Sequence, residues 1–305
     1  MTRRVAVLMG GLSAEREVSL VSGAAVIKAL TSLGYSVIAI DVGHDIVTKL
    51  APMRSSVDVI FNALHGQHGE DGCVQGLCEL MDIPYSHSGV LASALAMNKP
   101  LAKRLFQEAG IPVAASRVVT RDEVLAGHPM RRPYVLKPID EGSSVGVRLF
   151  VDDDAPPPFD SEPWPYGNEV MAEAYIPGRE ITVAVMGNKP LGMLEIRPHE
   201  GFYDYDTKYL EGRAEHLIPA PIPETDHTAA LDIAERAHRA LGCEGVSRAD
   251  FRYDDSEQGM GLRLLEINTQ PGMTPQSLVP EIAAHAGLSF SELVDWIVED
   301  AICRA

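Results

Sequence analysis

The chain has 305 residues, of which 46% are hydrophobic, and its formal net charge at pH 7 is −17. This length and composition indicate a globular protein of two or three compact units and exclude a disordered chain. The acidic charge disfavours a nucleic-acid-binding protein, and no apolar run reaches the length that spans a membrane.

Cysteine usage and the first residues favour a reduced, cytoplasmic protein. Cys73, Cys78, Cys243 and Cys303 include no CxxC pair, and a zinc half-site at the first two would lack its second half. We therefore expect buried free thiols. The first apolar run spans only about five residues, which is too short for the apolar region of a signal peptide.

The first 95 residues predict a parallel α/β layer. A helix is expected from Leu20 to Leu30, where apolar residues recur at helical spacing, and Gly34 ends it. Three short apolar runs predict buried strands, at residues 5–9, 37–40 and 57–64. Open α/β sheets bind ligands at the loops that follow their strands, so the candidate binding loops are 10–16 and 65–72.

The remaining chain mixes predicted helices and strands. Helices are predicted at residues 97–109 and 227–241, and Ser289 with Glu292 forms a capping box at the start of a last helix. Strands are predicted at residues 116–119, 134–138, 145–151, 169–176, 180–185, 248–252 and 262–267. An exposed linker is predicted at 152–165, which is rich in Asp and Pro, and a long loop that covers a site at 199–216.

Two predicted strands carry polar side chains at matched spacing. Glu266 and Asn268 are two residues apart in one strand, and Arg248 and Asp250 are two apart in the other. Residues i and i+2 of a strand point to the same face, and carboxylate and amide oxygens are ligands that Mg²⁺ prefers. An arginine beside such ligands indicates phosphoryl transfer. The alternative is a pair of solvated strand faces, which does not explain four such groups.

Lys137 ends a predicted strand and is followed by a turn rich in glycine and serine. Backbone N–H groups, small hydroxyls and a lysine can together hold phosphate oxygens. The segment 142–146 also fits the G-x-S-x-G motif of serine hydrolases, with Ser144 as nucleophile, but that motif requires a following helix and strand-forming residues follow here. A P-loop is excluded because no Gly-Lys-Ser/Thr follows. A plain hairpin turn remains an alternative.

Taken together, these motifs resemble the D-alanine–D-alanine ligases, a family of the ATP-grasp superfamily. The resembling segments occur in the family's order along nearly the whole chain, at residues 10–19, 64–72, 96–99, 137–146, 202–209, 248–250 and 266–278. Two positions depart from the common pattern. Ile139-Asp140 stands where many members have a Ser-Arg-like pair, and Gln270 stands where serine is frequent. Both neighbour functional residues without replacing one.

The resemblance implies an α/β and α+β protein with the ATP-grasp fold. An N-terminal parallel α/β domain (1–96) would precede a central domain (97–178) and a C-terminal domain (179–305) that sandwich ATP. The implied enzyme phosphorylates one D-alanine with ATP, and the amine of a second D-alanine attacks the D-alanyl phosphate to give D-alanyl-D-alanine for peptidoglycan precursors. Two Mg²⁺ ions, for which Mn²⁺ can substitute, are the implied cofactors, and family analogy suggests a homodimer.

The resemblance also implies roles for individual residues. The two D-alanines would be bound by Glu15, His65, Lys208, Ser277 and Leu278. ATP would be held by Lys99, Lys137, Ser144, Glu173, Ala174, Ile176 and Glu180, and the metal ions by Asp250, Glu266 and Asn268. Arg248 and the Gly272 N–H would face the oxyanion of the tetrahedral intermediate. Tyr209 would meet Ser143 and Glu15 across a closed, water-free site.

Other functions remain open at this point. The same fold would also suit D-lactate or D-serine as acceptor, although the pair Lys208-Tyr209 is of the dipeptide-forming type in this resemblance. A non-catalytic nucleotide-binding module is disfavoured because Lys137 and the polar groups of both metal-bearing strands are all present. A serine hydrolase at Ser144 is disfavoured by the hairpin context.

Overall fold

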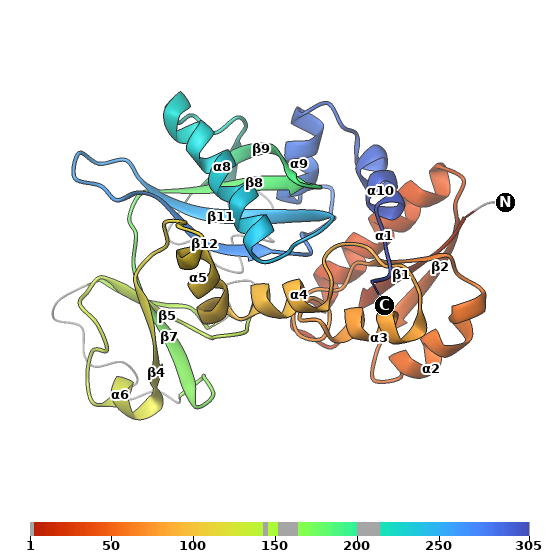
Figure 1. Cartoon of the computed structure of the whole chain (residues 1–305), viewed down its shortest axis with the longest axis horizontal. Coiled ribbons are helices and arrows are strands. Elements are labelled where there is room, and N and C mark those ends of the chain that lie inside the picture. Colours follow the sequence, from red (N-terminus) through yellow and green to blue (C-terminus); the bar gives the residue numbers. More distant parts are fainter. Residues whose placement is uncertain (1–2, 143–145, 152–163, 200–213, 305) are drawn as a thin grey trace.

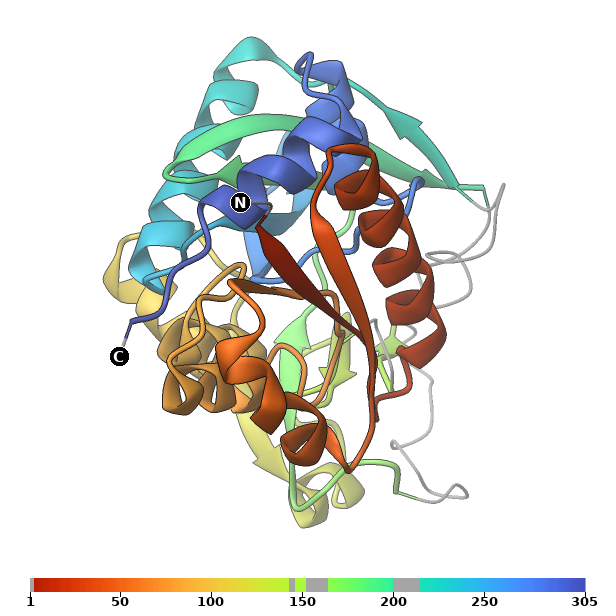
Figure 2. The same ribbon diagram turned by 90° about the vertical axis from the view of Figure 1, so that its right-hand side faces the viewer.

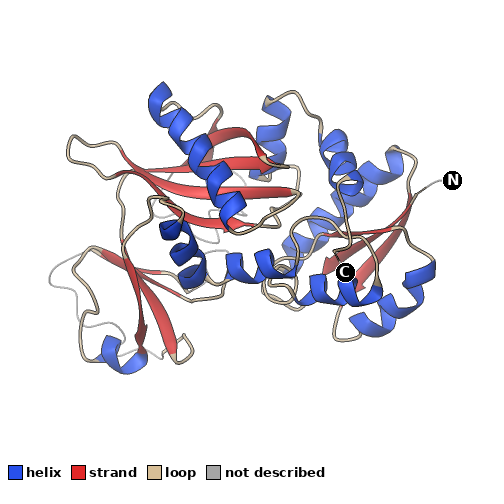
Figure 3. Ribbon diagram, in the orientation of Figure 1, coloured by secondary structure: helices blue, strands red, loops and turns tan. Residues whose placement is uncertain are grey.

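The computed structural model describes residues 3–142, 146–151, 164–199 and 214–304. These residues form three sheets with helices packed on them (Figures 1 and 3). Most of the predicted linker 152–165 and of the predicted loop 199–216 lies outside the described residues. So do four of the residues to which the resemblance gives a role: Ser143, Ser144, Lys208 and Tyr209.

The N-terminal sheet is parallel, as predicted, and its strand order is β2-β1-β3. Its strands are β1 (Arg4–Gly10), β2 (Ser36–Val42) and β3 (Val59–Asn62). Alternate residues of a strand face opposite sides, so the valines of β1 pack in one core with helix α1 (Arg16–Ser32), whereas Ala6 and Leu8 pack in another. Figure 2 views the molecule from this end, where α1 lies beside the strands. The smaller helices here are α2 (Ile46–Leu50), η1 (Ala51–Ser55) and α3 (Cys73–Met81).

The middle of the chain forms a four-stranded antiparallel sheet in the order β4-β7-β5-β6. Its strands are β4 (Ser116–Thr120), β5 (Tyr134–Lys137), β6 (Arg148–Phe150) and β7 (Glu169–Ala174), and α6 (Arg121–Leu125) packs on it. Strands β5 and β6 form an antiparallel pair, with Tyr134 opposite Phe150. Because a strand and not a helix follows the glycine- and serine-rich turn, the serine-hydrolase interpretation does not hold.

A five-stranded antiparallel sheet, β10-β9-β8-β11-β12, carries both predicted metal-bearing strands. Its strands are β8 (Arg179–Met186), β9 (Lys189–Pro198), β10 (Ala214–Leu217), β11 (Val246–Asp254) and β12 (Gly261–Asn268). One hydrophobic core joins this sheet to α4 (Val90–Met97), α5 (Lys99–Glu108) and α8 (Glu224–Ala240). Another joins it, through α9 (Leu278–His285) and α10 (Phe290–Glu299), to the N-terminal sheet.

The domain division 1–96, 97–178 and 179–305 stays a prediction. Helix α5 would belong to the central domain in that division, yet its residues Ala102 and Phe106 pack in the core of the five-stranded sheet. The capping box predicted at Ser289 and Glu292 is confirmed at the start of α10. Among the described residues, no helix is both long enough and apolar enough to cross a membrane.

The predicted helix 97–109 is wrong at its start. Met97 is the last residue of α4, and Asn98 has an extended backbone (φ −84°, ψ 91°) that separates α4 from α5. The Asn98 side chain accepts the Leu101 N–H at 3.1 Å, as an N-cap does. Pro100 fits the first turn of α5, where backbone N–H groups have no helical partner. Lys99 is therefore the first residue of a helix and not an interior one.

Other expectations also need correction. The sequence patterns did not predict α2, η1, α3, α4, α6, α9, β9 or β10, and residues 214–216 of the predicted loop lie in β10. The thiols were all expected to be buried, and this holds for Cys78 and Cys243. Cys73, the first residue of α3, is exposed, and Cys303, near the C-terminus, is partly exposed.

Candidate active site

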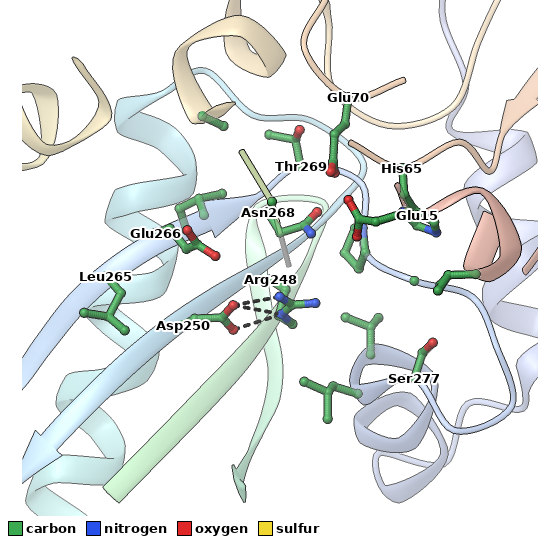
Figure 4. A pocket seen from close by; sticks show the side chains of 18 of the residues that line it. Glu15, His65, Glu70, Arg248, Asp250, Leu265, Glu266, Asn268, Thr269 and Ser277 are labelled. Atoms are coloured by element: carbon green, nitrogen blue, oxygen red, sulfur yellow. Dashed lines mark hydrogen bonds and ion pairs between the residues drawn. The ribbon is translucent and has the colours of Figure 1, made fainter. Parts of the chain in front are cut away.

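A cavity of about 660 Å³ gathers residues from the N-terminal loops, the β5–β6 turn and the five-stranded sheet (Figure 4). Many of the residues with an implied role line it: Glu15, His65, Lys99, Lys137, Glu180, Arg248, Asp250, Glu266, Asn268, Gly272, Ser277 and Leu278. The structure thus brings together residues that are up to 263 positions apart, from 15 to 278. The cavity is the candidate active site.

Strands β11 and β12 pair in a register that matches their polar side chains. Arg248 lies opposite Asn268, and Asp250 lies opposite Glu266. Because both pairs are two residues apart on their strands, all four side chains reach the same cavity (Figure 4). The expectation of two neighbouring strands is confirmed.

The Asp250 carboxylate is held in place from two sides. Arg248 donates from Nε to Oδ1 at 2.9 Å and from Nη2 to Oδ2 at 2.7 Å. Thr182 of β8 donates from Oγ1 to Asp250 Oδ1 at 2.6 Å. A bidentate arginine pair fixes orientation as well as charge. Asp250 is therefore presented to the cavity in a defined direction.

The donor set on these strands suits a hard divalent cation. Asp250 and Glu266 supply carboxylate oxygens, and Lys99 Nζ lies 3.6 Å from Glu266 Oε2. Asn268 Oδ1 accepts the Gln270 N–H at 2.7 Å, which fixes the amide, and a carbonyl oxygen has a second lone pair for another partner. Two carboxylates and an amide oxygen that face one cavity fit Mg²⁺.

Glu15 and His65 are tied together by a serine. Glu15 immediately precedes α1, and its side chain is buried at the cavity wall. Ser13 Oγ donates to the His65 carbonyl at 2.6 Å and accepts the Glu15 N–H at 3.2 Å. Burial lowers the pKa of His65, although the charge of Glu15 opposes this shift. A buried carboxylate beside a neutral imidazole is a suitable environment for an ammonium group.

Two glycines bring backbone close to Glu15. A β carbon at Gly66 would lie 2.9 Å from Glu15 Oε2, and one at Gly142 would lie 3.1 Å from the same atom. Gly66 also has a φ of +67°, which favours glycine. Lys99 Nζ donates to the Glu141 carbonyl at 2.5 Å and so ties α5 to the β5–β6 turn. This turn therefore reaches from the middle sheet to the N-terminal side of the cavity.

A turn and a helix start close the other side of the cavity. A β carbon at Gly272 would lie 2.9 Å from Ser277 Oγ, so a larger residue here would require the Ser277 side chain to move. Ser277 Oγ accepts the Thr274 N–H at 2.9 Å, and Leu278 is the first residue of α9. Helix N-termini attract anions, which suits a substrate carboxylate.

Similarity to known proteins shows the family to which the chain belongs. Models of the D-ala D-ala ligase N-terminus and C-terminus match residues 44–88 and 105–299. The chain is 55% identical to the D-alanine–D-alanine ligase of Paramagnetospirillum magneticum, over 99% of this chain and 100% of that protein. The chain belongs to the D-alanine–D-alanine ligase family.

Other relatives support the same assignment. The ligase is 53% identical to the D-alanine–D-alanine ligase of Rhodospirillum rubrum over the full length of both chains. Among solved structures, the D-alanine–D-alanine ligase of Bacillus anthracis in complex with ATP has a TM-score of 0.79 at 31% identity, covering 98% of this chain and 97% of that one. The VanG D-Ala:D-Ser ligase of Enterococcus faecalis has a TM-score of 0.79 at 30% identity, covering 98% of this chain and 99% of that one. The ATP-grasp fold expected from the sequence is confirmed.

Three residues expected at the ATP site do not line the cavity. Glu173 and Ala174 end strand β7, and Ile176 lies two residues further on. The side chains of Glu173 and Ile176 are buried. Glu173 and Ile176 therefore do not present their side chains to the cavity.

Glu70 and Leu265 are among the cavity residues that had no predicted role. Glu70 was part of a recognised motif, but only the fold shows that its carboxyl group is buried beside Glu15 (Figure 4). Leu265 also faces the cavity, directly before Glu266. The pairing of β11 with β12 slips by one residue between Asp250 and Phe251, which leaves Leu265 as an extra residue. Such a bulge breaks strand alternation, and no sequence signal marked it.

The departure at Gln270 has a structural account. Its side-chain amide donates to the Leu64 carbonyl, and its Oε1 accepts from Asn62 Nδ2 at 2.7 Å. Asn62 Nδ2 also donates to the Gly69 carbonyl at 2.9 Å. All of these side chains are buried. Gln270 therefore joins the turn after β12 to the N-terminal loop that carries His65, a connection that serine is too short to make.

We expect Glu70 to make the stability of the ligand-free enzyme fall with increasing pH. Burial and the charge of Glu15 raise the pKa of Glu70 from 4.5 to about 8, and Glu266 adds to the shift while Arg248 and the Gly66 N–H oppose it. Between these values the folded state holds a proton that the unfolded state has lost, so the free energy of unfolding decreases by up to about 1.4 kcal/mol per pH unit.

Glu70→Gln keeps an acceptor for the Gly66 N–H but cannot ionise. Urea unfolding from pH 5 to pH 8, without Mg²⁺ or substrates, should give a shallower decrease for Glu70→Gln than for the wild type. Glu257→Gln, at the exposed turn between β11 and β12, is the matched control and should follow the wild type. Parallel curves for Glu70→Gln and the wild type would contradict the expected ionisation.

Proposed function

We propose that this cavity joins two D-alanines through a D-alanyl phosphate at the expense of ATP. The observation that carries the proposal is the cross-strand set of Arg248, Asp250, Glu266 and Asn268 in one cavity with Glu15. Membership of the family, with relatives at 55% identity over 99% of the chain, gives the overall reaction. The protein is an ATP-dependent, ADP-forming carbon–nitrogen ligase, and the roles below assign that reaction to its residues.

ATP binding is assigned to the space between the middle sheet and the five-stranded sheet. Lys99 and Lys137 would hold the phosphates, together with Ser144 of the β5–β6 turn. Glu180 would accept hydrogen bonds from the ribose hydroxyls. Arg252 donates from Nη1 to Glu180 Oε1 at 2.8 Å and so fixes the orientation of this carboxylate. The backbone of residues 173–176 would border the adenine. The ATP-bound relative from Bacillus anthracis supports the use of ATP by this fold.

Metal binding is assigned to Asp250, Glu266 and Asn268, which would hold two Mg²⁺ ions, with Mn²⁺ as a substitute. When bound, such ions neutralise charge on the phosphates that are being transferred. The chain contributes a preset ligand geometry, because Arg248 and Thr182 orient Asp250 before any ligand arrives.

The first D-alanine is assigned to the N-terminal side of the cavity. Glu15 would pair with its ammonium group, and His65 would line the same pocket. Its carboxylate oxygen then attacks the γ-phosphorus, and the bond to the β-phosphate oxygen breaks to release ADP. The buried setting of Glu15 suits this step, because an acyl phosphate must be protected from water.

The second D-alanine is assigned to the start of α9. Ser277, the Leu278 N–H and Lys208 would hold its carboxylate. After its ammonium group loses a proton, the neutral amine attacks the acyl carbon and an oxyanion forms. Phosphate then leaves as the carbonyl is restored, and the nitrogen loses a second proton to give the amide. Arg248 and the Gly272 N–H would stabilise that oxyanion. Ser143 and Tyr209, which lie outside the described residues, are assigned to a link with Glu15 across the closed site.

We expect stereospecific, metal-dependent turnover. Phosphate release from ATP and Mg²⁺ should require D-alanine, should not occur with L-alanine, and should stop with a chelator until Mg²⁺ is restored. Because VanG is also a structural relative, D-serine and D-lactate should be offered with D-alanine in parallel, with products identified by mass spectrometry. Equal turnover of the two alanine enantiomers, or D-alanyl-D-serine as the main product of an equal mixture, would contradict the assignment.

The biological setting follows from the family. D-Alanyl-D-alanine is used in peptidoglycan synthesis, so the enzyme acts in cell-wall formation. We further infer a cytoplasmic location, because ATP and peptidoglycan precursors are made there, and a homodimer by family analogy. Size-exclusion chromatography with light scattering tests the dimer.

A further inference from the structure

A buried lysine outside the cavity makes an ion pair that the assigned roles do not use. Lys103 lies on α5 with 3% of its side chain exposed, and its ammonium group donates to Glu173 Oε2 of β7. Glu173 is equally buried, with 2% of its side chain exposed. Lys103 does not line the cavity. It therefore has no route to ATP except through Glu173.

The same carboxylate also holds the assigned phosphate-binding lysine. Lys137 Nζ donates to the other oxygen of Glu173, Oε1, at 2.5 Å. Lys137 lines the cavity and has 14% of its side chain exposed. Two ammonium groups thus share one carboxylate, with the phosphate-binding lysine on the open side and Lys103 on the closed side.

The charges of this cluster decide what Lys137 can offer a phosphate. With Lys103 present, the two ammonium groups and the one carboxylate carry a net charge of +1. Without Lys103, Glu173 and Lys137 would form a neutral buried pair, and Coulomb interactions are strong where water is excluded. A phosphate would then have to compete with Glu173 for the only remaining ammonium group of the cluster.

Isolated buried charges are costly, so the cluster needs all its members. Burial alone would raise the pKa of Glu173, but the ammonium groups of Lys137 and Lys103 lower it. Burial lowers the pKa of Lys103, and the direct pairing with Glu173 opposes this shift. The helix that carries Lys103 is fixed independently, because its neighbour Ala102 and then Phe106 pack in the core of the five-stranded sheet.

We propose that Lys103 is a positioning residue for ATP binding: it neutralises Glu173 from behind, so that Lys137 keeps its positive charge available for a phosphate oxygen. The proposal rests on the assigned role of Lys137. It also explains why a glutamate is tolerated directly beside a phosphate-binding lysine, where a lone carboxylate would repel ATP. Lys103 further joins α5, which packs on the five-stranded sheet, to β7 of the middle sheet.

The test compares the ATP affinity of three variants with that of the wild type by calorimetry, with Mg²⁺ and without D-alanine. Lys103→Met should weaken ATP binding by about tenfold or more, which corresponds to about 1.4 kcal/mol. Adding Glu173→Gln removes the carboxylate that captures Lys137, so the double variant should return to within about threefold of the wild type. Arg104→Met, which removes a positive charge from the exposed neighbouring position of α5, is the matched control and should bind ATP normally.

Steady-state kinetics give an independent readout. The KM for ATP should rise in Lys103→Met, while the KM for D-alanine changes less than about twofold, because Glu15 and Ser277 lie elsewhere in the cavity. A purely structural role for Lys103 predicts that the double variant is no better than the single one. Normal ATP affinity in Lys103→Met, or no recovery in the double variant, would overturn the proposal.

Two further measurements keep the outcomes separate. If Lys103→Met does not fold, Lys103→Gln serves in its place, since it removes the positive charge and keeps a donor for Glu173. ATP affinity within about threefold of the wild type in that folded variant would overturn the proposal. Lys137→Met tests the assigned role of Lys137. Unchanged ATP affinity in that variant would refute the phosphate role itself, whereas loss there with normal binding in Lys103→Met refutes only the role of Lys103.

Discussion

Glu266→Gln should abolish most of the ligase activity and leave the fold intact. The substitution keeps the size of the side chain and one oxygen donor but removes a negative charge from the assigned Mg²⁺ site. Metal-dependent charge neutralisation is worth several kcal/mol in the transition state, so kcat/KM should fall by about 10³-fold, which corresponds to about 4 kcal/mol. Phosphate release measured over a series of ATP and D-alanine concentrations gives kcat/KM.

The Mg²⁺ dependence separates this explanation from general damage. Glu266 has 33% of its side chain exposed and Lys99 as a neighbour at 3.6 Å, so the loss of its charge should not unfold the protein. The variant should need much more Mg²⁺ for half-maximal rate, whereas Glu257→Gln at the exposed hairpin turn should behave as the wild type does. A folded Glu266→Gln enzyme with a near-normal rate at limiting Mg²⁺ would show that Glu266 is not a ligand.

Strand periodicity explains why the polar residues of β11 and β12 in this site could be predicted from the sequence. Two residues on one strand with one residue between them share a face whatever the surrounding fold is, so Glu266 with Asn268 and Arg248 with Asp250 were assigned to common faces correctly. The pairing of the two strands also followed, because their polar positions match. The sequence could not reveal the bulge at Leu265, since a one-residue slip depends on the packing of both strands.

Local signals in helices were equally reliable where the capping chemistry was complete. Ser289 with Glu292 is a reciprocal cap, and α10 begins there. Asn98 is also an N-cap, but continuous apolar residues before it concealed the end of α4. The helix boundary was therefore lost, and with it the position of Lys99 at the start of a helix. Short elements such as α6 depend on tertiary packing and carry too little pattern of their own.

Burial was the property that the sequence predicted least well. Glu70 and Lys103 are ordinary charged residues in the sequence, yet the fold places one beside Glu15 and the other against Glu173. Their partners come from segments distant in the chain, and no local spacing records this. Gln270 is the same kind of case, because its role depends on Leu64 and Asn62, about 200 residues earlier in the chain. The family resemblance identified the reaction, and the fold identified the residues that support it.

Replacement of Arg248 should separate charge from geometry in the second half of the reaction. Arg248 is assigned to the oxyanion of the tetrahedral intermediate, and removal of one such donor typically costs about 2.7–4 kcal/mol, or about 10²–10³-fold in kcat. Arg248→Met should show this full loss. Arg248→Lys keeps the positive charge but loses the planar fork that binds Asp250 through Nε and Nη2, so we expect it to recover only a small part of the rate.

Replacement of Arg248 also affects the assigned metal ligand Asp250, because its carboxylate loses a hydrogen-bond partner in both variants. Thr182 Oγ1 still donates to Asp250 at 2.6 Å, so the carboxylate keeps one anchor and the metal site should weaken less than the rate does. Titration with Mg²⁺ measures this contribution, and rates at saturating Mg²⁺ then isolate the oxyanion effect. Arg263→Lys on β12, whose side chain does not line the cavity, is the matched control.

The role of Arg248 can be identified from the step of the reaction that its replacement slows. An oxyanion residue acts on peptide-bond formation, so both Arg248 variants should still bind ATP with nearly normal affinity. In both variants, kcat should fall by a much larger factor than the KM for ATP rises. If Arg248 serves only to orient Asp250, high Mg²⁺ should restore the rate, and Asp250→Asn should reproduce the same defect. An Arg248→Lys enzyme with kcat within about threefold of the wild type at saturating Mg²⁺ would rule out a transition-state contact by the guanidinium group, and the Gly272 N–H would then be the remaining assigned donor.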